Sequence, residues 1–148
     1  MLLFLSLPDE KFSSDEIEMF YDLGGLLQMV DDIFDLYDDL HGGTITPATL
    51  CGTFEELEEK YSRETRDFFD HYYSLLSSKP DFIYRLLFSF ARAFVCLSQF
   101  RKTEKKFNVS EIQKIAFIER SEMICDMGKL TNILLNLQIS RSLNRKIL

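Results

Sequence analysis

The stretch from residue 23 to residue 40 restricts the fold of this chain more than any other part of the sequence. Five aspartates fall among the nine residues from 31 to 39 and are interleaved with large apolar side chains. An α-helix turns by about 100° per residue, which separates the aspartates and the apolar residues onto two faces. The stretch therefore predicts a helix with one face in a hydrophobic core and the other face acidic.

The acidic face of this predicted helix combines four aspartates with two residues from earlier turns. These six residues are Gly24, Gln28, Asp31, Asp35, Asp38 and Asp39. The four aspartates lie within a sector of roughly 100° around the helix axis. Apolar residues cover the wider, opposite arc, and Asp32 lies between the two faces.

Negative charge at this density destabilises an isolated helix. Like charges at i,i+4 cost roughly 0.2–0.5 kcal/mol per pair, and the helix macrodipole disfavours carboxylates near the C-terminal end. No Lys or Arg lies between Glu18 and Lys60 to offset the repulsion. A divalent cation would relieve it, and Mg²⁺ prefers oxygen ligands of this kind.

Composition excludes several classes of protein. The chain has 148 residues, of which 46% are hydrophobic, enough for one domain with a core. Its net charge of −7 argues against a general nucleic-acid binder. Three cysteines without CxxC spacing favour a reducing, cytoplasmic compartment and thiols with no disulfide or zinc role. The start of the sequence lacks the basic region of a signal peptide, and no run reaches the roughly 20 apolar residues of a transmembrane helix.

Four long helices are predicted along the chain. The first begins after Ser13 or Ser14 and ends near Leu40, before two glycines. Thr53 and Glu56 fit a capping box at the start of the second helix. The later helices are expected over residues 53–76, 81–101 and from about 110 to near the C-terminus, with a polar connector over 102–107. No stretch has the two-residue period of a strand, so we predict an all-α antiparallel bundle that forms one domain over residues 1–148.

The motif Gly24-x-x-x-Gln28-x-x-Asp31-Asp32-x-x-Asp35 resembles the second aspartate-rich motif of the trans-prenyl diphosphate synthases. In that family, a helix with this pattern faces the substrate cavity. The same helix resembles the second metal motif of the terpene cyclases, and the squalene and phytoene synthases use a related helix. All of these enzymes share the class I isoprenoid synthase fold. The resemblance therefore implies an all-α bundle similar to the C-terminal half of that fold.

The resemblance also implies a Mg²⁺ site on the acidic face. Asp31 and Asp35 would be the leading ligands, Asp39 the third, and Asp32 a further carboxylate of the motif. The metal would hold the diphosphate of an allylic prenyl substrate and stabilise negative charge as the diphosphate departs. The chemistry would be that of a transferase that joins prenyl units or a lyase that ionises them.

The resemblance further implies that Gly24 and Gln28, which precede the aspartates, bind the prenyl diphosphate. Gln28 would lie one turn before Asp31 and close to the substrate. Gly24 would leave room for the substrate to approach the backbone.

The resemblance covers one of the two acid-rich motifs that the family places on facing helices. Only thirty residues precede Asp31, and no second aspartate cluster follows. We therefore expect this chain to correspond to the C-terminal part of a synthase and to be incomplete by itself. The partner that completes it would be a missing N-terminal half or, less simply, another copy in a homo-oligomer.

A second hypothesis assigns the acidic face no metal. In this interpretation the chain is a non-catalytic helical bundle that binds a protein partner, and the aspartates only keep one helix face in water. It predicts no dependence on Mg²⁺ and no cavity behind Asp31. The sequence leaves both hypotheses open, together with the length of the prenyl substrate and the nature of the product.

Overall fold

The computed structural model describes residues 12–147, so the apolar start of the sequence lies outside the described residues. The helices are α1 (Ser14–Phe34), α2 (Leu36–Gly42), α3 (Phe54–Leu76), α4 (Pro80–Phe107), the 3₁₀ helix η2 (Ile112–Phe117), α5 (Arg120–Met123) and α6 (Leu130–Ile147). Within this part of the chain the only strand-like pairing is an isolated bridge between Thr53 and Glu111. The predicted all-α fold is therefore confirmed.

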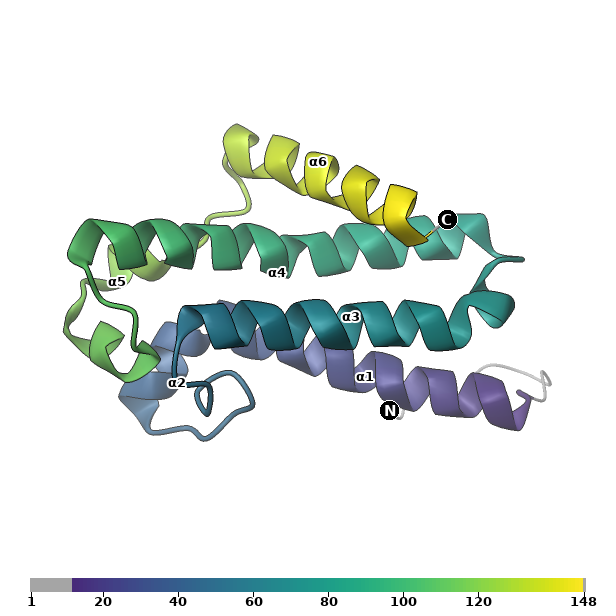
Figure 1. Cartoon of the computed structure of the whole chain (residues 1–148), viewed down its shortest axis with the longest axis horizontal. Helices are drawn as coiled ribbons and strands as arrows, with labels where there is room; N and C mark the ends of the chain where they lie inside the picture. The colour runs from purple at the N-terminus through teal and green to yellow at the C-terminus, as the bar shows by residue number, and fades with distance from the viewer. Residues whose placement is uncertain (1–11, 148) are drawn as a thin grey trace.

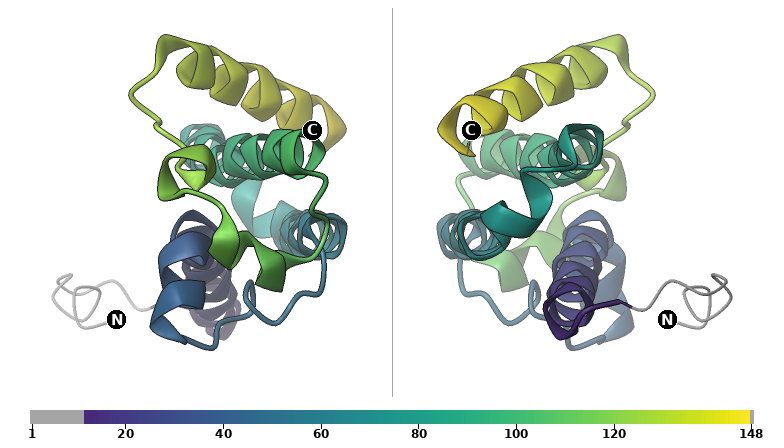
Figure 2. Two further views of the ribbon diagram at one scale, coloured as in Figure 1. Left: turned by 90° about the vertical axis from the view of Figure 1, so that its left-hand side faces the viewer. Right: turned by 90° about the vertical axis from the view of Figure 1, so that its right-hand side faces the viewer.

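The four long helices α1, α3, α4 and α6 run alternately in opposite directions (Figure 1). Seen end on, α1, α3 and α4 form a triangle, and α6 lies across α4 on the side away from α1 (Figure 2). α6 packs mainly on α4 and also touches α3. None of the helices between residues 12 and 147 combines the length and the hydropathy that crossing a bilayer requires.

The core is centred on α4, which contacts each of the other long helices. Phe90 lies in the middle of α4 and is fully buried. The rings of Phe68 and Phe69 on α3 meet it edge-on, with centroids 6.1 and 5.9 Å away. The buried Tyr61 hydroxyl donates a hydrogen bond of 2.9 Å to the Phe90 carbonyl oxygen. A buried hydroxyl needs such a partner, so this bond lets a large aromatic side chain fill the core.

The N-caps predicted from the sequence are present. Ser13 and Glu16 form a full capping box at the start of α1. At the start of α3, the Thr53 side chain accepts a bond from the backbone N–H of Glu56. The Glu56 carboxylate accepts instead from the backbone N–H of Gly52, at 2.7 Å. Both α1 and α3 therefore begin where a side chain satisfies an otherwise unpaired N–H group.

The first predicted helix is not continuous to residue 40, because the backbone bends at Asp35. This residue has φ −92° and ψ 2°, outside the helical region, and separates α1 from α2. Ile33 and Leu36, on either side of the bend, are both fully buried. A helix that already carries several carboxylates is weakly held, so burial of apolar side chains can decide its path.

The third predicted helix is longer than expected, and the connector predicted over residues 102–107 is wrong. α4 continues to Phe107 and ends where Asn108 adopts a left-handed conformation with φ 53°. Thr103 is buried in this segment, and its hydroxyl donates to the carbonyl oxygen of Glu122 at 2.8 Å. Tertiary contact therefore keeps a polar segment helical that sequence pattern alone assigns to a loop.

The prediction of one continuous last helix is also wrong, since residues 110–147 form three separate helices. η2 and α5 fold back toward α2 and α4, where Ile112 and Ile115 are fully buried. A turn then precedes α6: the backbone N–H of Gly128 donates to the Asp126 carboxylate at 2.8 Å. Asn132 closes the turn by donating to the Asp126 carbonyl oxygen at 2.9 Å. The predicted helix is therefore interrupted between Met123 and Leu130, around Gly128.

Substitutions at three glycines test the backbone conformation of α1 and of the end of α2. A Cβ added at Gly24 or Gly25, in the middle of α1, would meet no atom within 4 Å. We expect Gly24→Ala and Gly25→Ala each to raise the free energy of unfolding by about 0.5–1 kcal/mol, because glycine is unfavourable inside a helix. Gly43 ends α2 with φ 70°, so Gly43→Ala should lower it by about 1 kcal/mol. Urea denaturation measures all three; stabilisation by Gly43→Ala would contradict the left-handed end of α2.

Candidate functional site

Three aspartates of the predicted metal site remain in helical register across the bend. The backbone N–H of Asp35 donates to the carbonyl oxygen of Asp31 at 2.9 Å, and that of Asp39 donates to Asp35 at 2.8 Å. We call Asp31, Asp35 and Asp39 the acidic column. Asp31 and Asp35 are exposed, and Asp39 is half-buried. The backbones of these three residues therefore stay one helical turn apart across the bend.

Electrostatic repulsion acts within this column. The pKa of Asp39 is raised, first by partial burial and then by the negative charges of Asp35, Asp32, Asp31 and Asp38. Among residues 12–147, no ion pair involves any member of the column. The repulsion inferred from the sequence thus contributes to the raised pKa of Asp39, and no described side chain forms an ion pair with a member of the column.

Asp38 has a different role from the one predicted for the acidic face. Arg120 of α5 binds it with two hydrogen bonds, Nε to Oδ1 at 2.8 Å and Nη2 to Oδ2 at 2.6 Å. This contact lowers the pKa of Asp38. Because 82 residues separate the two side chains, no local pattern in the sequence could have paired them.

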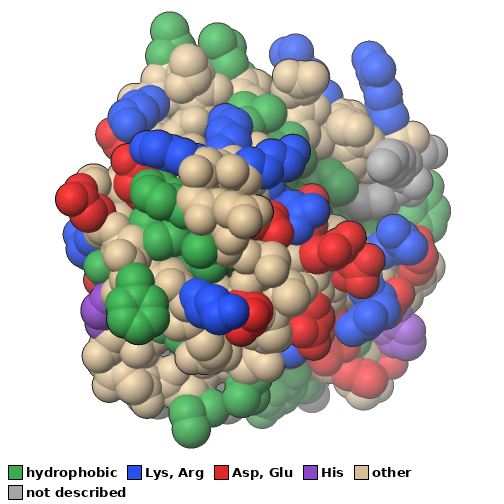
Figure 3. Space-filling model, turned by 60° about the vertical axis from the view of Figure 1, so that its left-hand side comes forward, with side chains coloured by type: hydrophobic (Ala, Val, Ile, Leu, Met, Phe, Trp, Pro, Cys, Tyr) green, Lys and Arg blue, Asp and Glu red, His purple; other side chains and the backbone are tan. Residues whose placement is uncertain are grey.

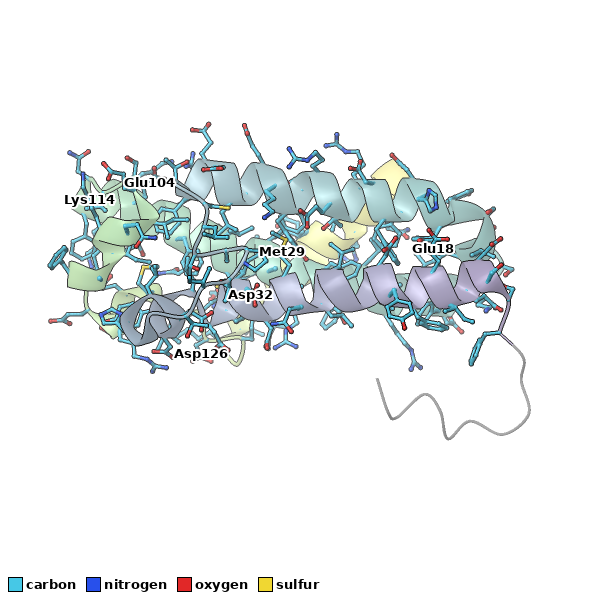
Figure 4. The ribbon with its side chains drawn as sticks, turned by 90° about the horizontal axis from the view of Figure 1, so that it is seen from below. Glu18, Met29, Asp32, Glu104, Lys114 and Asp126 are labelled. Carbon is cyan, nitrogen blue, oxygen red and sulfur yellow. The ribbon has the colours of Figure 1, made fainter. Side chains whose placement is uncertain are left out.

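The exposed Gln28 and the buried Asp32 form a hydrogen-bonded pair on α1. The Gln28 Nε2 atom donates to Asp32 Oδ1 at 2.8 Å. Asp32 is only 4% exposed, and Figure 4 places it near the C-terminal end of α1. Its Oδ2 atom is buried and has no partner among the described protein atoms. A buried carboxylate oxygen without a partner is costly, so this atom could accept a further donor or a cation.

Gly24 lies on open surface. A Cβ at this position would meet no atom within 4 Å, and the residue is exposed. The backbone of α1 is therefore accessible one turn before Gln28, at the place where the motif predicts that a substrate approaches.

The structure does not gather the aspartates around one point. Among residues 12–147, no three His, Cys, Asp or Glu side chains are close enough together to hold a metal ion. Two surface grooves have cavity volumes of about 440 and 540 Å³, and the acidic column lines neither of them. Asp31 and Asp35 of the column are exposed to solvent on a surface of the bundle, and Asp39 is half-buried.

A second arginine lies near this end of α1 and was not singled out by the sequence. The Arg92 guanidinium carbon of α4 is 5.5 Å from the ring centroid of Phe34, the last residue of α1. Arg92 and Arg120 thus bring positive charge from two later helices to the two sides of the bend. Their positions depend on how α4 and α5 pack, which residue spacing cannot predict.

The three cysteines, Cys51, Cys96 and Cys125, are free and buried. Comparison of this chain with protein-family models, with curated proteins and with solved structures finds no match. The resemblance to isoprenoid synthases is therefore carried by the motif around the acidic column alone.

The opposite pKa shifts of two neighbouring aspartates predict opposite effects on stability. The pKa of Asp39 is raised in the folded state, so its ionisation above the unfolded pKa disfavours folding. We expect Asp39→Asn to raise the urea midpoint at about pH 7 and to have little effect at about pH 3, where the carboxyl is protonated in both states.

Asp38→Asn is the matched control. The pKa of Asp38 is lowered by Arg120, so this carboxylate stabilises the fold above its unfolded pKa, and that contribution is lost as the pH falls. The substitution should therefore lower the urea midpoint at neutral pH. Shifts of the same sign for both variants would show that the charges are not arranged as described.

Proposed function

We propose that this chain is part of a class I isoprenoid synthase-type domain, and that its acidic column binds Mg²⁺ together with the diphosphate of a prenyl substrate. The observation that carries the proposal is the unbroken hydrogen-bond register of Asp31, Asp35 and Asp39 across the bend. That register preserves the spacing by which the motif resembles the metal-binding helices of the family.

The donors of the column have the chemistry that Mg²⁺ requires. Carboxylate oxygens are hard ligands that this ion prefers. Asp31 and Asp35 are exposed and free of ion pairs within the described chain. The pKa of Asp39 is raised by partial burial and then by the neighbouring carboxylates, and binding of a divalent cation would reduce the repulsion among these carboxylates. The ion would stabilise the negative charge of a departing diphosphate.

The other residues of the motif have supporting roles in this proposal. Asp32 fixes the side chain of Gln28 by accepting its Nε2 hydrogen bond. A fixed amide beside the column can orient a bound diphosphate with little further loss of side-chain entropy. Gly24 leaves the α1 backbone open one turn earlier. In this proposal α1 and α2 together carry the acidic column that binds Mg²⁺, and α1 also carries the Gln28 amide that contacts the diphosphate and the open backbone at Gly24 where the substrate approaches.

The column supplies one of the two acid-rich motifs that the proposed metal site needs. Because no three ligating side chains converge within residues 12–147, a bound ion would complete its coordination with diphosphate oxygens, water and carboxylates from elsewhere. We propose that those carboxylates lie on a second acid-rich helix outside this sequence, in an N-terminal half or a separate chain. Another copy of this chain would supply only the same column again.

Isothermal titration with Mg²⁺ and inorganic pyrophosphate tests the metal site. We expect the wild-type chain to bind pyrophosphate only when Mg²⁺ is present. Asp31→Asn/Asp35→Asn should weaken this binding by roughly tenfold or more, because it removes two ligands. Asp67→Asn/Asp70→Asn is the matched control: it removes two exposed carboxylates from α3 and should change the affinity by less than about twofold.

Two results would reject the metal site. One is wild-type protein that gives no Mg²⁺-dependent heat with pyrophosphate. The other is an equal loss of binding in both double variants, which would reflect net charge alone. Either result favours the second hypothesis, a non-catalytic helical bundle that binds a protein partner.

A further inference from the structure

A straight groove runs between α1 and α3, on a side of α1 distinct from the acidic column. Its cavity volume is about 540 Å³. At about 100° per residue, Asp31 of the column lies roughly 180° around the helix from Asp22 of the groove. Figure 4 looks onto the two helices side by side, with Glu18 of α1 on the side facing α3. The groove is therefore separate from the proposed metal site.

The lining of the groove repeats at helical spacing along both walls. On α1 it includes Glu18, Asp22 and Gly25, and on α3 it includes Glu64 and Asp67, among others. Residues at i, i+3, i+4 and i+7 form a line parallel to a helix axis. Each wall spans residues 18–26 or 64–72, a length of about 12 Å at 1.5 Å per residue. Two parallel walls of this kind form a channel that suits a third helix of two to three turns.

Acidic side chains dominate the groove, whose lining also includes His71. Four carboxylates lie on it, from Glu18, Asp22, Glu64 and Asp67, and no Lys or Arg contributes to its lining. The other groove is different, because Glu55, Glu58 and Glu59 share it with Arg63, Arg66 and Arg101. Charges of both signs are also mixed over the face shown in Figure 3. A ligand that complements the α1–α3 groove must therefore carry positive charge.

The floor of the groove is formed by apolar and aromatic side chains. Leu26, Phe68 and Tyr72 form it and are at most 5% exposed, whereas Tyr21 stands at the edge and is 60% exposed. The Tyr72 hydroxyl donates to Asp22 Oδ2 at 2.6 Å, which ties the floor to one carboxylate. Such a floor accepts an apolar or aromatic side chain, while the carboxylates accept Lys or Arg beside it.

Gly25 marks a place where the groove stays open. A Cβ here would meet no atom within 4 Å, and of the described glycines only Gly43 has a positive φ. Neither packing nor backbone conformation thus requires glycine at this position, although glycine weakens the helix. Gly24 is equally open but lies outside the groove. The absence of a side chain at Gly25 has an evident use only if something approaches α1 closely there.

We propose that the α1–α3 groove binds a basic amphipathic helix of a partner protein. The apolar face of that helix lies over Leu26, Phe68 and Tyr72, and its Lys or Arg side chains pair with the four carboxylates. Helix-in-groove recognition uses this division between apolar anchors and charged edges. Complementary charge at the edges adds specificity and speeds association.

A synthetic amphipathic peptide of Lys and Leu, long enough for about three helical turns, is the probe. Fluorescence anisotropy should show that it binds the full chain and that a Glu/Leu peptide with the same pattern does not. Gly25→Phe should weaken binding by about tenfold or more by filling the groove, and Gly24→Phe by less than about twofold. Circular dichroism confirms that both variants fold.

A second pair of variants tests the charges. Glu18→Gln/Asp67→Asn should weaken binding about tenfold, whereas Glu59→Gln/Asp70→Asn removes two charges outside the groove and should have less than about a twofold effect. Equal effects of the two double variants, or of the two phenylalanine variants, would overturn the proposal. So would the absence of peptide binding, or self-association that Gly25→Phe abolishes, since the groove would then join two copies of this chain. These outcomes do not depend on Mg²⁺ or pyrophosphate.

Discussion

The packing of α4 against its neighbours is the interaction on which the rest of the structure depends. Phe90 lies at its centre, enclosed by aromatic rings of α3 and bonded through its carbonyl oxygen to Tyr61. α1, α3 and α6 are each placed by their contact with this helix. Both surfaces discussed above are consequences of that packing, because it decides which sides of α1 are left for other partners.

α1 carries negative charge on two sides for different physical reasons. The acidic column places Asp31 and Asp35 on the surface and Asp39 partly buried, where burial and the neighbouring negative charges raise the pKa of Asp39. The groove instead arranges its carboxylates around an apolar floor, and one of them is held by Tyr72. The first arrangement suits a small, highly charged cation, and the second suits positive charge carried on an apolar body. A net charge of −7 is thus distributed in a way that composition alone does not reveal.

The predictions from sequence succeeded where the cause is local. The N-caps predicted at Ser13 and Thr53 involve residues three apart, and both are present. The capping box predicted at Thr53 is only half formed, because the Glu56 carboxylate accepts from the backbone N–H of Gly52. The column kept its register because i→i+4 bonds are local too. The predictions failed at Asp35, over residues 102–107 and around Gly128. At the first two places buried side chains, such as Leu36 and Thr103, set the course of the chain, and near Gly128 a turn built on Asp126 interrupts the helix.

The sequence by itself determined the all-α fold and the line of aspartates on α1 and α2, because helical period and capping are encoded within a few residues. Only the tertiary structure decided which of those aspartates stay unpaired. Arg120 reaches Asp38 across 82 residues, and Tyr72 reaches Asp22 across 50. The α1–α3 groove likewise exists only after two distant helices pack side by side. Contacts of this range depend on the whole core, and no spacing within one segment predicts them.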